Sequence, residues 1–192
     1  MRVLGDVGFL EYERMLYEWP RVHWLTRDGM RAVGLTGDAA GPKLAELDHD
    51  LSVVELAHHL AVLQPSHRVV TEREIRRVEP NPAAGPEAAV RADVQQFGTG
   101  RGTGGRAFPD LVSVGEGGAP VWVHELERSR KPGPRLERVM LAYVWAEHIT
   151  GVVYWTVPDL LESVQTAADA ANARAREAGR EPAIVVRKWA PA

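Results

Sequence analysis

The spacing of apolar and polar residues predicts two β-hairpins. The first covers residues 9–25, where apolar side chains alternate loosely on both sides of a Trp-Pro pair. The second joins strands at 108–114 and 121–127 across a glycine-rich turn. Successive side chains of a strand point to opposite faces, so the odd-numbered residues of 121–127, two valines and then two glutamates, should share one face. An apolar start with an acidic end is typical of a metal site at the rim of a sheet.

Helical periodicity predicts the remaining elements. A helix should run to about residue 64, capped by Asp48 or by a box of Ser52 and Glu55, and a second capping box should start a short helix at Thr71. Irregular structure is expected over 79–86, a strand over 88–97 and a mobile hairpin tip over 98–106. Further elements are expected as a helix to about 148, a strand over 151–157, a helix over 158–179 and a strand over 182–189. This order predicts an α/β fold with a partly parallel sheet.

The N-terminal segment should form a separate small unit. After the first hairpin, Thr26 should cap a short helix that ends near Gly34. The hairpin and helix resemble the wing and final helix of a winged-helix domain. A recognition helix has no counterpart before Phe9, so base-specific reading by this segment is not expected. The alternative is a hairpin packed on the main domain. We predict a partial winged-helix unit over 1–36 and an α/β domain over 43–192.

Composition limits the functional classes. The chain has 192 residues, 45% of them hydrophobic, which suits one ordinary domain with a small appendage. It has no cysteine, so disulfides, thiolate zinc sites and cysteine nucleophiles are excluded. A net charge of -3 means that phosphate contacts must come from local basic patches. Without a long apolar run or a signal-peptide pattern, we expect a cytoplasmic protein with no membrane partner.

The second hairpin carries a candidate catalytic motif. Pro109-Asp110 lies on its first strand, Glu125 and Glu127 lie on the next, and Lys131 follows. This pattern resembles the restriction-endonuclease-like nucleases, in which Pro-Asp precedes Glu-x-Lys. The resemblance implies a mixed sheet flanked by helices, with Asp110 and Glu125 as ligands of Mg²⁺ or Mn²⁺. Glu127 occupies the usual lysine position, where it would bind the metal or orient the water, and a helix starting at Arg128 would bring Lys131 back over the strand ends.

Other residues have weaker functional assignments. The resemblance also makes Glu55 a candidate for an additional acid from the first core helix. Guanidinium groups that could contact DNA phosphates are expected from Arg73, Arg76, Arg77, Arg101, Arg106, Arg128 and Arg130. The alternative for both the acids and the arginines is a solvated surface whose charges pair with each other.

Several short motifs, read together, narrow the resemblance. They are His49-Asp50-Leu51, Thr71 to Arg76, Pro109-Asp110, Glu125 to Lys131, and Tyr143. In this respect the chain resembles the replication-relaxation proteins of bacterial plasmids and integrative elements. The resemblance implies a DNA-associated accessory role in replication, relaxation or mobilisation, with DNA and replication or mobilisation proteins as partners. Cleavage of DNA, a non-catalytic DNA-binding or assembly module, and a toxin or restriction subunit remain alternatives.

Overall fold

The computed structural model describes residues 5–15, 21–35, 39, 41–78, 92–93, 106–118, 121–146, 149–181 and 184–190. The chain divides into two compact units, Met1–Leu51 and Ser52–Ala192. The boundary falls inside helix α3 (Leu47–Leu63).

The N-terminal unit contains a hairpin and a short helix. Strands β1 (Leu10–Glu13) and β2 (Val22–Leu25) pair antiparallel, and α2 (Arg27–Ala32) follows directly. The Thr26 hydroxyl accepts a hydrogen bond from the Gly29 backbone N–H at 3.0 Å, and so caps α2. The predicted hairpin and capped helix are therefore confirmed.

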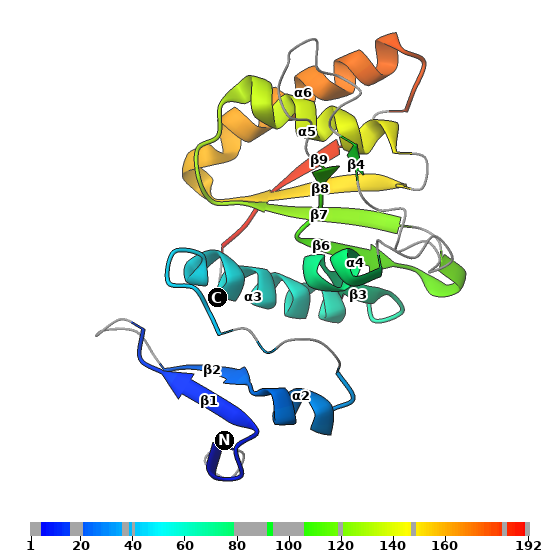
Figure 1. Cartoon of the computed structure of the whole chain (residues 1–192). Helices are drawn as coiled ribbons and strands as arrows, with labels where there is room; N and C mark the ends of the chain where they lie inside the picture. Colours follow the sequence, from blue (N-terminus) through cyan, green and yellow to red (C-terminus); the bar gives the residue numbers. More distant parts are fainter. Residues whose placement is uncertain are drawn as a thin grey trace. The chain divides into compact units, whose positions relative to one another are not determined.

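The second unit is built on a five-stranded mixed sheet (Figure 1). Its strand order is β3 (Arg68–Thr71), β6 (Leu111–Val114), β7 (Val121–Glu127), β8 (Gly151–Thr156) and β9 (Ile184–Lys188). The first three strands pair antiparallel, whereas β7, β8 and β9 run parallel. A separate pair consists of β4 (Ala92–Asp93) and β5 (Arg106–Ala107). The predicted α/β class with a partly parallel sheet is confirmed.

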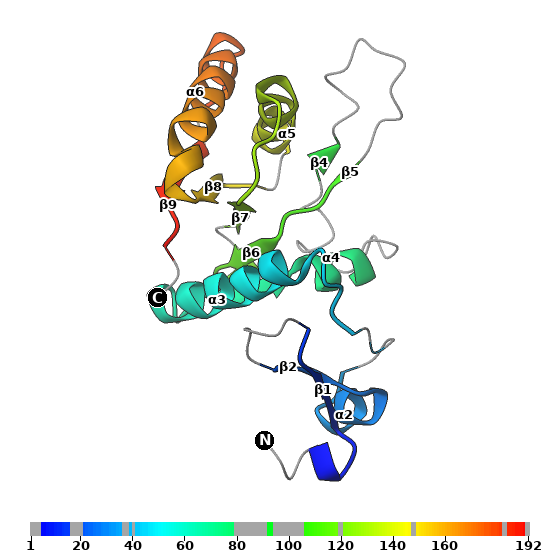
Figure 2. The ribbon, with the colours of Figure 1, turned by 90° about the vertical axis from the view of Figure 1, so that its left-hand side faces the viewer.

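Helices cover both faces of this sheet (Figure 2). They are α3, α4 (Glu72–Val78), α5 (Gly133–Trp145) and α6 (Leu161–Glu177), with short 3₁₀ turns η3 (Glu116–Gly118) and η4 (Pro158–Leu160). The larger apolar core joins one sheet face to α5 and α6 and includes Val123, Met140 and Ala168. The smaller core joins the other face to α3 through Leu56 and Leu126. Burial of apolar surface in these two cores is the main favourable contribution to folding.

Three local predictions can be checked. The capping box at Thr71 is confirmed, because the Thr71 backbone N–H donates to Glu74 Oε2 at 2.8 Å and the Glu74 N–H donates to Thr71 Oγ1 at 3.4 Å. The predicted caps of the preceding helix are wrong, because α3 already begins at Leu47 and its two candidate caps lie inside it. The helical turn expected from Arg128 is absent, and α5 begins at Gly133. The interpretations of 79–86 and 98–105, and most of the strand predicted over 88–97, lie outside the described residues.

Candidate functional site

Two of the predicted site residues lie opposite each other at the ends of neighbouring strands. Strands β6 and β7 pair Leu111 with His124, so continuing this register by one residue places Asp110 opposite Glu125. Asp110 precedes β6 directly, and its Oδ2 accepts a hydrogen bond from the Leu126 backbone N–H at 2.8 Å. The Asp110 carbonyl also accepts from the Glu72 N–H at 3.1 Å. These backbone contacts fix the Asp110 carboxyl at the end of β7.

Glu125 is held from the helix layer. The Tyr143 hydroxyl on α5 donates a hydrogen bond to Glu125 Oε1 at 2.5 Å. Desolvation raises the pKa of Glu125 well above its usual value, and the negative charge of nearby Asp110 raises it further. The Tyr143 hydrogen bond and the Lys131 charge act in the opposite direction. Two carboxyls in mutual repulsion favour binding of either a shared proton or a cation.

Glu127 and Lys131 form an ion pair beside these acids. Lys131 Nζ lies 2.7 Å from Glu127 Oε2, and the Glu127 side chain is only 4% exposed whereas that of Lys131 is 41% exposed. Glu127 Oε1 also accepts from the Ser129 backbone N–H and hydroxyl, at 3.3 and 3.4 Å. The lysine therefore reaches the site from an irregular segment between β7 and α5. The helical turn expected to carry it is absent, because α5 starts two residues after Lys131.

A buried tyrosine adds an unsatisfied polar group to this site. Tyr154 on β8 is paired in register with Glu125. Its side chain is buried, and among the described residues its hydroxyl has no hydrogen-bond partner. Burial raises the pKa of Tyr154 well above its usual value, and Glu125, Glu127 and Asp110 add to this effect. A buried hydroxyl without a partner is costly, and a bound water or ligand would satisfy it.

The donor set suits a small hard cation held mainly by water and phosphate. Within the described part of the chain, no three His, Asp, Glu or Cys side chains are grouped as a metal site. Glu127 is bound by Lys131 and Ser129, whereas Asp110 and Glu125 each accept one of the hydrogen bonds described above and lie opposite each other. Mg²⁺ commonly uses one or two protein carboxylates and completes its shell with water and substrate phosphates. Asp110 and Glu125 therefore fit Mg²⁺ or Mn²⁺, and no all-protein cage is needed.

The predicted DNA-binding arginines lie on several different elements where the structure describes them. Arg73 and Arg130 are exposed, whereas Arg76 bonds Glu72 Oε1 at 2.6 Å and lies over the Phe108 ring at 4.0 Å. Arg128 is partly buried, and its Nη1 donates to the Ser52 hydroxyl of α3 at 2.6 Å. For the other three, Arg77 lies in α4, Arg106 begins β5, and Arg101 lies outside the described residues.

Sequence reasoning missed how Tyr143, Tyr154 and Ser129 contribute to the site. Tyr143 lies on the apolar face of α5. A hydroxyl among Leu, Met and Val side chains was the sequence feature that could have identified it as a site residue. Glu55, the candidate additional acid, lies on α3 on the other face of the sheet, where it lines a cavity with Trp155.

The chain matches no protein-family profile, no curated protein and no solved structure. Among the described residues, no helix is both long enough and apolar enough to span a membrane.

Proposed function

We propose that this chain is a DNA-associated accessory protein whose second unit is a restriction-endonuclease-like domain that cleaves DNA with Mg²⁺ or Mn²⁺. The observation that carries the proposal is the placement of Asp110 opposite Glu125 at adjoining strand ends, beside the buried Tyr154, whose hydroxyl has no hydrogen-bond partner within the described part of the chain. The resemblance to replication-relaxation proteins supports a role in plasmid replication, relaxation or mobilisation. In this proposal, the N-terminal hairpin and helix α2 correspond to the winged-helix part of those proteins.

The order of elements supports the nuclease assignment. Helix α3 precedes the first strand of the sheet, β3, and α4 and the β4–β5 pair come before the hairpin of β6 and β7. Helix α5 then leads to β8, which is parallel to β7. The acids lie where the antiparallel part of the sheet joins the parallel part, at β7. Fold alone does not determine activity, so the argument for hydrolysis depends on the site.

The chemistry assigned to the site is phosphodiester hydrolysis. A water oxygen bonds to phosphorus and the water gives up a proton to solvent, while the P–O bond to the leaving oxygen breaks and the leaving oxygen takes up a proton from solvent. A bound divalent cation would lower the pKa of the attacking water and neutralise phosphate charge. Asp110 and Glu125 would hold that cation. Lys131, whose ammonium is partly exposed and held by Glu127, donates to a phosphate oxygen as its negative charge grows.

A second candidate is a non-catalytic DNA-binding or assembly module with the same fold. The Glu127–Lys131 ion pair favours it, because the glutamate neutralises the only lysine of the motif. The hydrogen bond from Tyr143 also occupies one oxygen of Glu125. Both contacts are typical of a stabilised structural site as well as of a catalytic one.

Nicking of supercoiled plasmid separates the two candidates. The natural chain is incubated with plasmid in Mg²⁺, Mn²⁺ or EDTA, beside Asp110→Asn and Glu125→Gln, which keep side-chain size but remove charge. Glu116→Gln, in the exposed β6–β7 turn, is the matched control. We expect metal-dependent nicking that falls at least about 100-fold in the two site variants and is unchanged in the control.

Two outcomes would remove the nuclease assignment. One is equal nicking by all variants, which would indicate a contaminant. The other is no nicking by any protein in either metal. Binding of the same plasmid fragment by the natural chain, measured by fluorescence anisotropy, would then support the non-catalytic module.

A further inference from the structure

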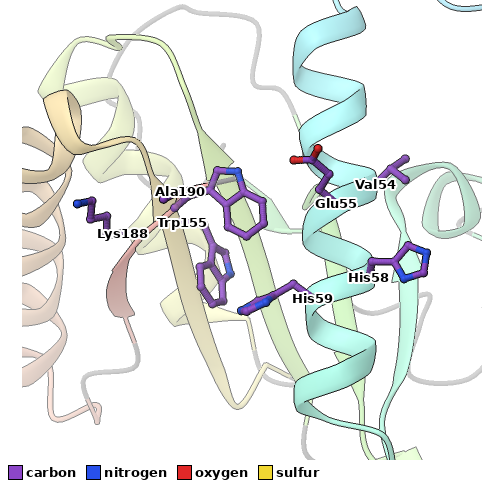
Figure 3. Close-up of a pocket in the computed structure, with 8 residues that line it drawn as sticks. Val54, Glu55, His58, His59, Trp155, Lys188 and Ala190 are labelled. Atoms are coloured by element: carbon purple, nitrogen blue, oxygen red, sulfur yellow. The ribbon is translucent and has the colours of Figure 1, made fainter. Parts of the chain in front are cut away.

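A cavity of about 630 Å³ lies on the opposite sheet face from the acidic cluster, between α3 and the strands β8 and β9. Its aromatic walls come from His59, Trp155 and Trp189, and Glu55 lies at its margin. Figure 3 shows Glu55 extending from α3 on the side of the strands, while His58 points away. The volume falls in the range of ordinary small-ligand pockets.

The rings of the aromatic wall contact one another. The Trp155 and Trp189 rings meet edge to face, with centroids 6.1 Å apart and planes at 82°. His59 meets Trp155 in the same manner, at 5.7 Å and 88°. Trp155 Nε1 donates to Nδ1 of buried His124 at 3.2 Å, and His124 Nε2 lies 2.9 Å from the Ser113 hydroxyl. The half-buried Trp155 therefore offers a fixed surface for stacking.

Groups that accept and groups that donate hydrogen bonds both line this cavity. The exposed Glu55 carboxylate can only accept hydrogen bonds when ionised. His59 and Lys188 also line the cavity, and each carries an N–H group that can donate. A complementary ligand is therefore flat and carries both a donor and an acceptor on its edge. A quaternary ammonium would suit the rings and the carboxylate but has no acceptor.

We propose that this cavity binds a nucleobase and prefers bases that carry an exocyclic amine. Adenine, cytosine and guanine place an amine donor close to a ring-nitrogen or carbonyl acceptor on one edge. The Watson–Crick edge of uracil or thymine presents one N–H between two carbonyl oxygens, which would face the Glu55 carboxylate unfavourably. Stacking on Trp155 is available to every base, so Glu55 supplies the discrimination.

The test is calorimetric titration of the full chain with AMP, CMP and UMP in EDTA. Metal-dependent hydrolysis cannot occur in EDTA, so the result is independent of the proposed nuclease activity. AMP and CMP should bind at least about tenfold more tightly than UMP. Glu55→Gln, on an exposed helix surface, should reduce that preference to about twofold or less, because an amide can also donate. Glu116→Gln should leave the preference unchanged.

A second arm identifies the source of the base. Short oligodeoxyadenylate that binds at least about tenfold more tightly than AMP would assign the cavity to single-stranded nucleic acid, and equal affinity would assign it to free nucleotides. Three results would overturn the proposal. They are no binding of any nucleotide, equal affinities for AMP, CMP and UMP in both the natural chain and Glu55→Gln, and tighter binding of choline than of AMP.

Discussion

Acidification should destabilise this protein through one buried histidine. His124 is 1% exposed and lies between Ser113 and Trp155. An indole N–H can only donate, so His124 Nδ1 must be the acceptor and Nε2 carries the proton in the neutral ring. A second proton would have to go on Nδ1. That protonation would break the hydrogen bond from Trp155 and place a charge in the interior.

The expected loss follows from the pKa of His124, which burial lowers from 6.5 to about 4, with a smaller contribution from the positive charge of His67. Because the folded-state pKa is lower than the unfolded one, the stabilisation is fully present above about pH 6.5. It is lost progressively as the pH falls toward about 4. At about 1.36 kcal/mol per pKa unit, the difference between the unfolded-state and folded-state pKa values of His124 corresponds to about 3 kcal/mol of stability.

Urea denaturation at several pH values between about 7 and about 4.5 measures this loss. The informative variant is His124→Gln, whose carbonyl can accept from Trp155 and whose amide can donate to Ser113 without titrating. The natural chain should lose about 2.5 kcal/mol more than this variant over the range. His58→Gln removes an exposed histidine of α3 and should lose stability in parallel with the natural chain. Parallel curves for the natural chain and His124→Gln would refute the reasoning.

Two further substitutions test the acidic cluster and the sheet. Glu125→Gln should stabilise the metal-free protein by about 1 kcal/mol or more near neutral pH, because the buried site disfavours the ionised carboxyl. This gain in stability should disappear at acid pH, where the natural side chain is also neutral. Thermal melts in EDTA at several pH values will measure the gain. Gly151→Ala should cost about 1–3 kcal/mol in chemical denaturation, because the added Cβ would lie 2.3 Å from the Trp122 ring. Gly133→Ala, with no atom within 4 Å of the new Cβ, is its control, and equal stabilities would contradict the steric argument.

The sequence was sufficient where structure depends on near neighbours. Alternation along 121–127 correctly separated the glutamates from His124 and Leu126, because strand geometry alone decides the face. The capping box joins Thr71 to Glu74, three residues later, and could be predicted equally well from the sequence. The helical turn predicted from Arg128 does not form, because Pro132 disfavours helical geometry in the residue before it.

Contacts between distant segments could not be predicted. Ser52 has the pattern of a helix cap, yet its hydroxyl accepts from Arg128, 76 residues away. The Tyr143 bond to Glu125 likewise depends on how α5 packs on the sheet. Lys131 and Glu127 are only four residues apart in the sequence. Their ion pair could still not be predicted, because it forms in an irregular segment, where spacing does not determine which side chains meet.

Two neighbouring residues of strand β7 lie in incompatible environments on opposite faces of the sheet. Glu125 accepts a hydrogen bond from Tyr143, and the adjacent His124 accepts one from Trp155. Deleting one residue ahead of them would move Glu125 to the place of His124, against the indole, and His124 to the place of Val123 in the larger apolar core. Length changes in β7 should therefore be tolerated much less well than substitutions. Directed libraries on this scaffold should vary residue identity along the strand and keep its length fixed.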